Sequence, residues 1–545
     1  MPRYHNASTL LASAASVFLL STPQVFAASD SEVAELRREM DAMRREMHVL
    51  QSRVAKYEHT TTAANTHAAH APHRLVEAPA NEPQPVFAEA PLAYHGPRRE
   101  ADSHIVLAEG PLLSWKEFRA ASSKEEAVHI GGMQIGFPQG RPTIASDDKA
   151  YAFSVGLLFQ EDLGGFLGMT SRPGEGAGNF NKFAQNAARL RVYFSWRYKD
   201  WVANVTPNFG SISTDGSVSL FEANLNYTGL HNTTLTVGYF QPRMEEESAE
   251  RPVAFEFLER PTIVNLVRNL AGGVARFSVG GEHYEKRWLA AAYFTGQKYG
   301  DRSKDTTIVD SQTGAVVRVA GRPYLSKDID VHVGAGATSV FKVNENSKGR
   351  QLTLSDNMEV PLGETNLLTS GALTNVAQIW AAGPQLALRW KRFLLKSEYY
   401  HIGVQRANNS EAVHLPSLGF DGWYVAANYT VFGKPRSYNE KIAAFTTPGV
   451  EYDFDPAHNH WGALEVSGRW SVTNLYGEGN QGGTGINGNQ QTVWQGGLNW
   501  YPNRHFKFML DYARFMVSRS KGVSGNVNLF GRDGNAIVGR VQASF

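Results

Sequence analysis

Cysteine is absent from this chain of 545 residues. Without it, the protein has no disulfide, no thiolate ligand for a metal ion and no thiol nucleophile. Beyond the N-terminus, no run of about 18 apolar residues is available for a membrane-spanning helix. The formal net charge is only +1, and there is no basic block of the kind that binds nucleic acid. These absences exclude a disulfide-stabilised domain, a helical membrane protein and a nucleic-acid partner.

The first residues are typical of a secretory signal peptide. Arg3 and His5 precede an apolar run at residues 10–20, which is too short to span a bilayer. Residues 25–27 then offer a cleavage site that ends in a small residue. We therefore expect residues 1–27 to be removed from an exported protein.

A heptad pattern predicts a coiled coil over residues 30–58. Apolar residues recur at alternating spacings of three and four, which places them along one seam of a helix. A lone amphipathic helix lying on a surface is the alternative. The number of helices in the coiled coil stays open, because methionine fits several oligomeric states. The seam residues are Val33, Leu36, Met40, Met43, Met47, Leu50, Val54 and Tyr57.

Residues 59–128 are predicted to be a linker rich in Ala, Pro and His. Its first part, to about residue 100, cannot bury a core, so we expect it to be extended or disordered. Residues 103–127 leave room for a short helix. Imidazole side chains can bind zinc or nickel, but nothing rigid holds the histidines of this linker together. We therefore predict no metal site and no cofactor; the histidines concerned are His59, His67, His70 and His73.

The rest of the chain, residues 129–545, alternates as β-strands do. In residues 189–198 every second side chain is apolar, and arginines occupy the opposite face. In residues 221–227, Phe221 shares an apolar face with Leu225. Short turns such as residues 198–200 and longer Gly/Asn-rich stretches such as residues 477–491 separate the strands. The same alternation recurs at residues 201–206, 423–430, 464–470 and 506–512.

The last strand indicates where this apolar face points. Ile537 and Val541 share one face, Arg540 lies on the other, and the chain ends on Phe545. In an outer-membrane barrel the apolar face meets lipid and the arginine points into water. At roughly 20 to 30 residues per strand with its connection, the segment predicts an all-β, transmembrane antiparallel barrel of about 16 strands. A barrel of that size has an aqueous lumen.

Short motifs then appear in a characteristic order, beginning with residues 221–229, 237–242, 257–260 and 272–274. They continue at residues 383–384, 398–399, 422–425, 433–438, 463–470 and 497–503. In order and spacing these motifs resemble the phosphate-selective porin O/P family. The resemblance implies a sixteen-stranded outer-membrane channel, three per assembly, that passes anions and selects phosphate or polyphosphate in its best-known members.

By this resemblance, residues 241–269 fold into the lumen and constrict it, with an ordinary external loop as the alternative. Fixed charges in a narrow pore set its selectivity. Where phosphate-selective members carry a lysine in this loop, Val253 stands here. Those members also carry an arginine-rich run in a later loop, whereas the comparable residues 341–363 offer only three basic residues. A general charged wall, in which arginines pair with carboxylates, is the other reading of the basic side chains. The candidate anion-binding residues are Arg189, Arg191, Arg197, Arg243, Arg251, Arg260, Arg268, Arg276, Arg389 and Arg469.

Enzymatic motifs have little support. Residues 483–488 fit the glycine pattern of dinucleotide sites, but no helix follows to hold a phosphate. Zinc-protease and serine-elbow motifs are absent from the sequence. A scattered Ser/His/Asp triad is the remaining alternative, since such triads are recognised by geometry. We predict that the protein is not an enzyme.

The sequence thus predicts a channel for passive diffusion of small hydrophilic solutes, anions such as phosphate among them. We expect a homotrimer in the bacterial outer membrane, in contact with lipid and lipopolysaccharide, with a periplasmic N-terminal region. The alternative is a structural tether, whose coiled coil binds peptidoglycan or a periplasmic partner.

Overall fold

The computed structural model describes residues 112–123, 127–170, 180, 183–210, 218–300, 311–345, 349–362, 366–408, 415–478, 488–518 and 532–545. The expected signal peptide, the coiled coil and most of the linker lie outside these residues, as does most of the glycine pattern. Among the described residues, no helix has the length and apolar character needed to cross a membrane.

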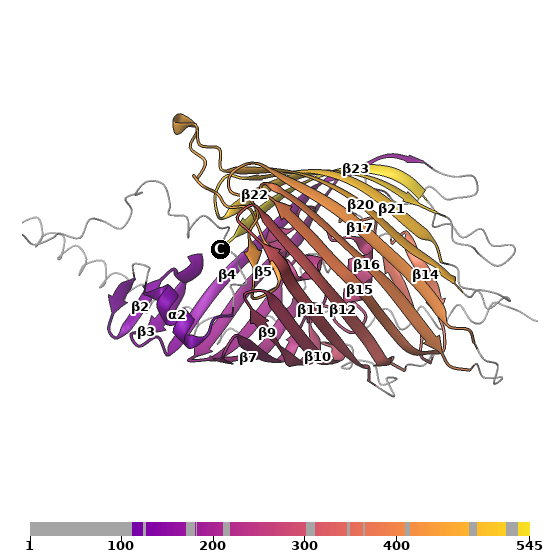
Figure 1. The fold of residues 1–545 in the computed structure, drawn as a ribbon, viewed down its shortest axis with the longest axis horizontal. Helices are drawn as coiled ribbons and strands as arrows, with labels where there is room; N and C mark the ends of the chain where they lie inside the picture. The colour runs from indigo at the N-terminus through magenta and orange to yellow at the C-terminus, as the bar shows by residue number, and fades with distance from the viewer. Residues whose placement is uncertain are drawn as a thin grey trace, which may run out of the picture. The chain divides into compact units, whose positions relative to one another are not determined.

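Sixteen antiparallel strands close into a barrel (Figure 1). Strands that are neighbours along the chain pair with each other, and β23 (Arg532–Ser544) pairs with β4 (Tyr151–Thr170) to complete the ring. Closure gives each wall strand two partners, which satisfies backbone groups that a bilayer cannot satisfy. The prediction of an all-β barrel of about 16 strands is confirmed. The other wall strands are β5 (Ala184–Tyr198), β6 (Trp201–Asn208), β7 (Ser219–Leu230), β8 (Thr233–Phe240), β9 (Arg276–Glu285), β10 (Trp288–Lys298), β11 (Thr313–Leu325), β12 (Ile329–Lys342), β15 (Val376–Trp390), β16 (Phe393–Arg406), β17 (Leu418–Phe432), β20 (Ala463–Glu478), β21 (Gln490–Tyr501) and β22 (Phe506–Val517).

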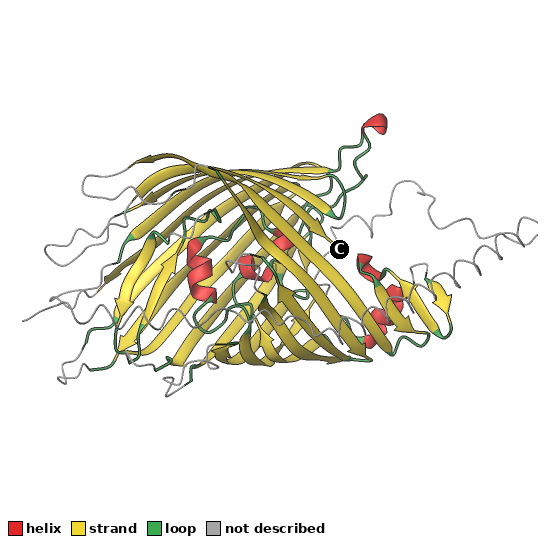
Figure 2. Ribbon diagram, turned by 180° about the vertical axis from the view of Figure 1, so that it is seen from behind, coloured by secondary structure: helices red, strands yellow, loops and turns green. Residues whose placement is uncertain are grey.

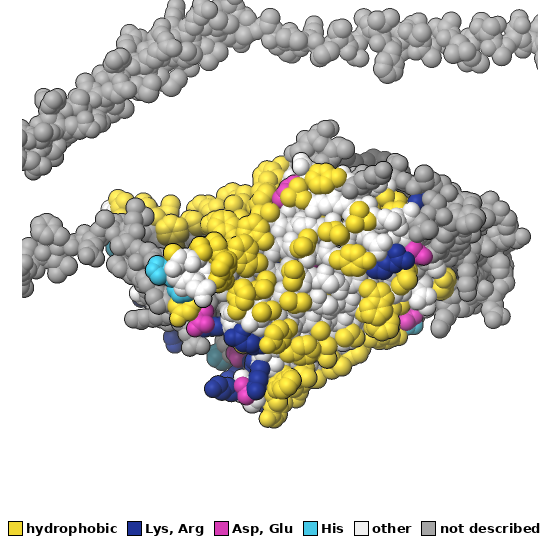
Figure 3. Space-filling model, turned by 90° about the horizontal axis from the view of Figure 1, so that it is seen from above, with side chains coloured by type: hydrophobic (Ala, Val, Ile, Leu, Met, Phe, Trp, Pro, Cys, Tyr) yellow, Lys and Arg dark blue, Asp and Glu magenta, His cyan; other side chains and the backbone are white. Residues whose placement is uncertain are grey.

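Side chains of the wall alternate between an apolar outer face and a polar inner face. On β6, Trp201 is 48% exposed, whereas Val202 and Thr206 are 4% and 0% exposed. Figure 3 looks onto the outside of the molecule, where hydrophobic and uncharged side chains dominate and charged ones lie mainly towards the ends. Aromatic rings meet near the strand ends, as between Tyr151 and Tyr198 at 4.8 Å. Such rings favour the membrane–water interface.

One residue of the wall departs from the predicted alternation. We expected Phe221 on the outer face with Leu225, but its ring is buried and lies 3.7 Å from the guanidinium of Arg191. The cause is a shift of register between Thr206 and Pro207, where β6 pairs with the start of β7. Such a bulge re-aims the side chains beyond it. Phe221 therefore faces the lumen.

The two ends of the barrel have different connections. Short turns, such as residues 199–200, 231–232 and 391–392, join strands at one end, and the long connections lie mostly at the other. In outer-membrane barrels the short turns are periplasmic. Among the described residues, two long connections and one long turn carry further helices or strands.

Each of these three segments has secondary structure of its own. The first, which we call the inner loop, is residues 241–275, with α3 (Glu246–Ala249), η3 (Pro252–Ala254) and α4 (Thr262–Arg268). The second, the hairpin loop, is residues 343–375, with β13 (Leu352–Asp356) and β14 (Leu368–Leu373). The third, the folded turn, is residues 433–462, on the short-turn side, with β18 (Tyr438–Asn439), β19 (Ala444–Phe445) and η4 (Pro456–His458).

The inner loop lies inside the barrel, and Figure 2 shows helical segments enclosed by the ring of strands. Ile263 and Val264 of α4 are fully buried and pack with Phe420 and Tyr424 of β17. From the periplasmic side, Arg436 of the folded turn donates a hydrogen bond to the carbonyl of Ala254 at 2.8 Å. The expectation that this loop folds into the lumen is therefore met, and the external loop is excluded.

A small appendage precedes the barrel wall. It comprises α2 (Trp115–Ser122), β1 (Val128–Ile130), β2 (Met133–Gly136), η2 (Pro138–Gly140) and β3 (Thr143–Ser146). Helix α2 begins with a capping box formed by Ser114 and Glu117. Strand β3 pairs with the first residues of β4, whereas β23 pairs with β4 only from Leu158 onward. We call residues 128–146 the flap.

Candidate functional site

A cavity of about 280 Å³ lies inside the barrel between the inner loop and the wall strands β5 and β7. Five arginines converge on it, two from β5 and three from the inner loop. We call this cavity the arginine pocket. Its lining is Arg189, Arg191, Phe221, Gln241, Arg243, Pro252, Glu259, Arg260, Asn265, Arg268, Asn269, Val274 and Asp356.

Strand and loop position the arginines by different contacts. Arg189 donates to both carboxylate oxygens of Glu259 at 3.0 Å, and Arg268 donates to Oε1 of Gln241 at 2.8 Å. Arg191 lies against the ring of Phe221 and makes a cation–π contact. Each guanidinium carries five N–H donors in a fixed plane, which suits oxyanions.

Several of these N–H groups donate no hydrogen bond to the described residues. The Nε and one Nη of Arg191, and the Nε atoms of Arg260 and Arg268, are buried and have no hydrogen-bond partner among the described residues. A buried donor without a partner costs free energy, so a group that accepts its hydrogen bond is favoured there. The pocket is therefore suited chemically to a small anion with several acceptor oxygens.

Two carboxyl groups oppose the five arginines. Burial would raise the pKa of Glu259, but Arg189 and Arg540 outweigh it and lower that pKa to about 2. Asp356 of the hairpin loop behaves differently, because burial raises its pKa to about 7. Burial also lowers the pKa of Arg268 to about 10, with Arg189 adding to the effect. At neutral pH the pocket therefore keeps an excess of positive charge.

The glutamates of the inner loop lie mainly on its other face. Lys396 of β16 places its Nζ 2.7 Å from Glu247 and 2.6 Å from Glu250. Glu246 and Glu256 lie 3.7 Å from the same ammonium. All of these side chains are buried. The loop thus separates its charges, with carboxylates towards β16 and three arginines towards the pocket. Counting the charged residues of the inner loop along the sequence cannot show that they lie on two faces.

Arg540 holds the inner loop from the closing strand. We expected this side chain in water, but it is 1% exposed. It donates to Oδ2 of Asp162 at 2.8 Å and to the carbonyl of Leu258 at 2.7 Å. At this level the inner loop packs against β23, so the arginine meets protein instead of water. Arg469 of β20 does the same, donating to the carbonyl of Glu259 at 2.8 Å.

The structure brings five of the ten candidate arginines into the arginine pocket, namely Arg189, Arg191, Arg243, Arg260 and Arg268. Arg197 lies at the short-turn end and donates to the carbonyls of Leu113 and Lys199. Arg389 likewise donates to a turn carbonyl. Arg276 bonds to the carbonyls of Gly272 and Gly296, and Arg251 is not part of the pocket lining.

Some residues that shape the site carried no signal in the sequence. Val253, where the family resemblance led us to expect a lysine, is buried against wall residues and does not line the pocket. Asp356 reaches the pocket from the hairpin loop, and Lys396 anchors the inner loop from the wall. Gln241 and Arg436, which anchors the inner loop from the folded turn, belong by contrast to the motifs at residues 237–242 and 433–438, which could have pointed to them.

The sequence model of the family described as phosphate-selective porin O and P matches residues 176–545. The chain belongs to this family. It is a passive channel of the bacterial outer membrane, crossing that membrane as a β-barrel. The matched region of this porin begins inside the first connection of the wall, so α2, the flap and β4 precede it. No curated protein sequence matches the chain.

Solved structures similar to this porin include outer-membrane proteins, among them a channel and a porin. The channel DcaP of Acinetobacter baumannii is 11% identical, with a TM-score of 0.42 over 74% of this chain and 99% of that one. An anion-selective porin from Comamonas acidovorans is 9% identical, with a TM-score of 0.41 over 72% and 100%. OmpT of Vibrio cholerae, in a trimer form, is 10% identical, with a TM-score of 0.40 over 73% and 100%. Such distant likenesses say nothing about the solute.

Proposed function

We propose that this porin passes small anions in preference to cations, and that the arginine pocket is the selective part of its pore. The observation that carries this proposal is the convergence of five arginines on one cavity that two carboxyl groups oppose. Low-dielectric walls concentrate the field of such charges, so their effect on permeating ions is larger here than in a wide lumen. In a wide lumen, by contrast, dissolved salt screens a fixed charge beyond about 8 Å at physiological ionic strength.

The unfilled donors define the class of solute. Guanidinium groups bind planar or tetrahedral oxyanions through paired hydrogen bonds. Arg191, Arg260 and Arg268 keep buried N–H groups without partners among the described residues. The pocket volume of about 280 Å³ leaves room for a small oxyanion but not for a large one. Inorganic phosphate is therefore the first solute to test, in line with the family's name.

The test is a recording in planar lipid bilayers under a salt gradient, where the reversal potential gives the ratio of anion to cation permeability. Wild type should prefer chloride over potassium, and added phosphate should reduce the chloride current. Arg191→Gln should lower the permeability ratio several-fold. Arg389→Gln is the matched control, because Arg389 lies outside the pocket, and it should leave the ratio unchanged. A wild-type preference for cations would overturn the proposal.

A further inference from the structure

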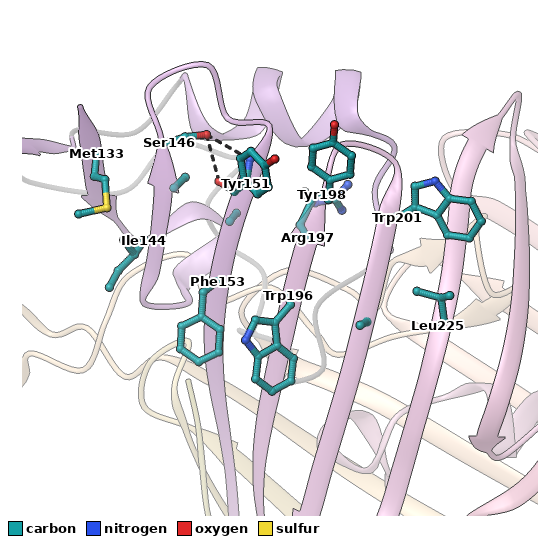
Figure 4. Close-up of a pocket in the computed structure, with 13 residues that line it drawn as sticks. Met133, Ile144, Ser146, Tyr151, Phe153, Trp196, Arg197, Tyr198, Trp201 and Leu225 are labelled. Carbon is teal, nitrogen blue, oxygen red and sulfur yellow. Dashed lines mark hydrogen bonds between the residues drawn. The ribbon is translucent and has the colours of Figure 1, made fainter. Parts of the chain in front are cut away.

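Helix α2 lies against the lumen face of the barrel wall, at the end with the short turns. The carbonyl of Leu113, just before the helix, accepts hydrogen bonds from Arg197 of β5 at 2.7 Å and from Thr228 of β7 at 3.1 Å. Arg197 points into the lumen, because the residues on either side of it, Trp196 and Tyr198, are exposed on the outer face (Figure 4). The helix is therefore placed inside the periplasmic mouth of the pore.

Several contacts fasten α2 to this part of the wall. The indole of Trp115 donates to the carbonyl of Lys149 at 3.0 Å, and its backbone N–H donates to Asp200 at 2.7 Å. The ring of Phe118 packs with Ala152 of β4. The helix is thus held on the lumen side of the first wall strands.

The folded turn covers another part of the lumen face at the same end. Arg318 of β11 donates hydrogen bonds to the carbonyls of Ile442 and Ala443, both at 2.7 Å. The hydroxyl of Tyr438 lies 2.8 Å from Nδ1 of His332 on β12. Ala443 also packs in an apolar cluster with residues of β8, β10 and β11. The turn therefore extends from its own strands, β17 and β20, to the lumen face of these more distant ones.

Lys441 joins the folded turn to α2. Its Nζ lies 2.9 Å from Oε1 and 3.0 Å from Oε2 of Glu117, 324 residues earlier in the chain. The same ammonium lies 5.3 Å from the centre of the ring of Tyr284 on β9. The side chain of Glu117 is 43% exposed and that of Lys441 is 23% exposed, so water weakens the ion pair. A contact of this strength can break and re-form while both segments stay folded.

A groove of about 580 Å³ lies beside this ion pair, between α2 and the barrel wall. We call it the mouth groove. On the helix side its lining includes Glu117 and Ala120, and on the wall side it includes residues 228–234 and Tyr284. Polar and charged groups are frequent in this lining, which suits water. A small hydrophilic solute therefore has room to pass between α2 and the wall.

We propose that α2 and the folded turn form a second constriction of the pore, at its periplasmic mouth, and that the ion pair of Lys441 with Glu117 holds it narrow. When the pair breaks, the gap between the two segments widens towards the mouth groove, and solutes pass faster. The helix lies outside the segment that matches the family, because it precedes residue 176. The constriction sets the width of the pore and does not depend on which ion the pore prefers.

The first test uses a neutral solute, on which a lost charge has no direct effect. Vesicles that contain the porin are placed in an isotonic solution of arabinose, and the rate of swelling reports the entry of the sugar. Lys441→Met should let the vesicles swell at least twofold faster than wild type does. Equal rates for this variant and wild type would overturn the proposal.

The matched control is Lys286→Met. It removes an exposed lysine from the turn between β9 and β10, at the same end of the barrel, and should leave the swelling rate unchanged. Heat-modifiable migration on gels reports that the barrel of each variant is folded. A rate that rises as much in Lys286→Met as in Lys441→Met would show that the ion pair has no special role, which also overturns the proposal.

The second test closes the gap again. The chain has no cysteine, so Glu117→Cys/Lys441→Cys carries only the two introduced thiols. Untreated, this double variant should swell as fast as Lys441→Met. A short bis-maleimide that joins the two thiols should restore the wild-type rate, and the cross-linked chain should migrate differently on a denaturing gel. Thiols that cannot be joined, or a cross-link that leaves the swelling fast, would overturn the proposal.

The third test asks whether solutes pass through the mouth groove. A polyethylene-glycol maleimide on Ala120→Cys, which lines the groove, should at least halve the swelling rate. Asp147→Cys, exposed on the turn between β3 and β4 and outside the lining, should swell at the same rate before and after the same treatment. A rate unchanged by the label on Ala120→Cys would show that solutes leave by another route, and the proposal would fall.

Discussion

At the scale of single residues, Glu259 is the carboxylate that most reduces the positive charge of the arginine pocket. Its carboxylate engages Arg189 at 3.0 Å and lies 3.4 Å from Arg540. With a pKa lowered to about 2, it stays ionised at any working pH. It therefore occupies donors that a permeating anion would otherwise meet.

Glu259→Gln should raise the ratio of anion to cation permeability, in the direction opposite to Arg191→Gln. The amide keeps the size of the side chain and removes its charge, so Arg189 becomes available to the solute. Reversal potentials measured under the same salt gradient check the direction. A ratio that falls in this variant would contradict the role given to Glu259.

Asp356 gives the pocket a dependence on pH. Because its pKa is raised to about 7, its carboxyl is mostly protonated at pH 5.5 and mostly ionised at pH 8.5. Protonation removes negative charge, so anion preference should rise as the pH falls through about 7. Recording reversal potentials across this range tests the sign. In Asp356→Asn the dependence should be lost and the preference fixed at its low-pH value.

At the scale of elements, the inner loop is held by polar contacts to the wall as well as by its apolar core. Lys396 is central, since four carboxylates of the loop surround its ammonium within 3.7 Å. Removing one partner from a buried ionic cluster leaves charges uncompensated, at a cost of about 3–5 kcal/mol. We therefore expect the inner loop to detach from the wall before the barrel unfolds.

Lys396→Met should therefore loosen the inner loop and widen the pore. We expect larger and noisier single-channel conductance, with the barrel still heat-modifiable on gels. Lys391→Met, on an exposed turn of the same hairpin, is the control and should conduct as wild type does. Conductance unchanged by Lys396→Met would mean that the apolar contacts of α4 suffice to hold the loop.

The wall could be predicted from sequence because strand alternation is local. Trp201, Val202 and Thr206 point where their period of two places them. Phe221 could not be placed, since a register shift in its pairing with β6 is a property of two strands together. For the same reason, the sequence identified the arginines of the pocket as candidates but did not show which of them come together. That Arg189 and Arg268 meet, while Glu247 turns to Lys396, depends on how the loop folds against distant strands.

At the scale of the whole molecule, the N-terminal heptads bear on how copies of the chain assemble. We propose a homotrimer, as expected from the family resemblance. The expected coiled coil lies outside the described residues, so its contribution is a prediction from sequence. In such a trimer the walls of neighbouring barrels would contact each other, in addition to any contact through the coiled coil.

Deleting residues 30–58 should weaken the trimer without abolishing it, because these wall contacts remain. Cross-linking and light scattering of the detergent-extracted protein would measure the loss. A deletion variant that is wholly monomeric would show that the coiled coil alone joins the copies. A wild-type monomer in mild detergent would exclude the trimer.

Arg540 also links the position of the inner loop to the closure of the barrel. It lies on β23, which closes the ring against β4, and it binds the carbonyl of Leu258, 282 residues earlier in the chain. Until β23 is in the wall, this contact with the inner loop cannot form. The strand that closes the ring against β4 is thus also the strand that anchors the inner loop, so the loop is fixed in this way only when the ring closes. Maturation of the pore and sealing of the wall become a single event.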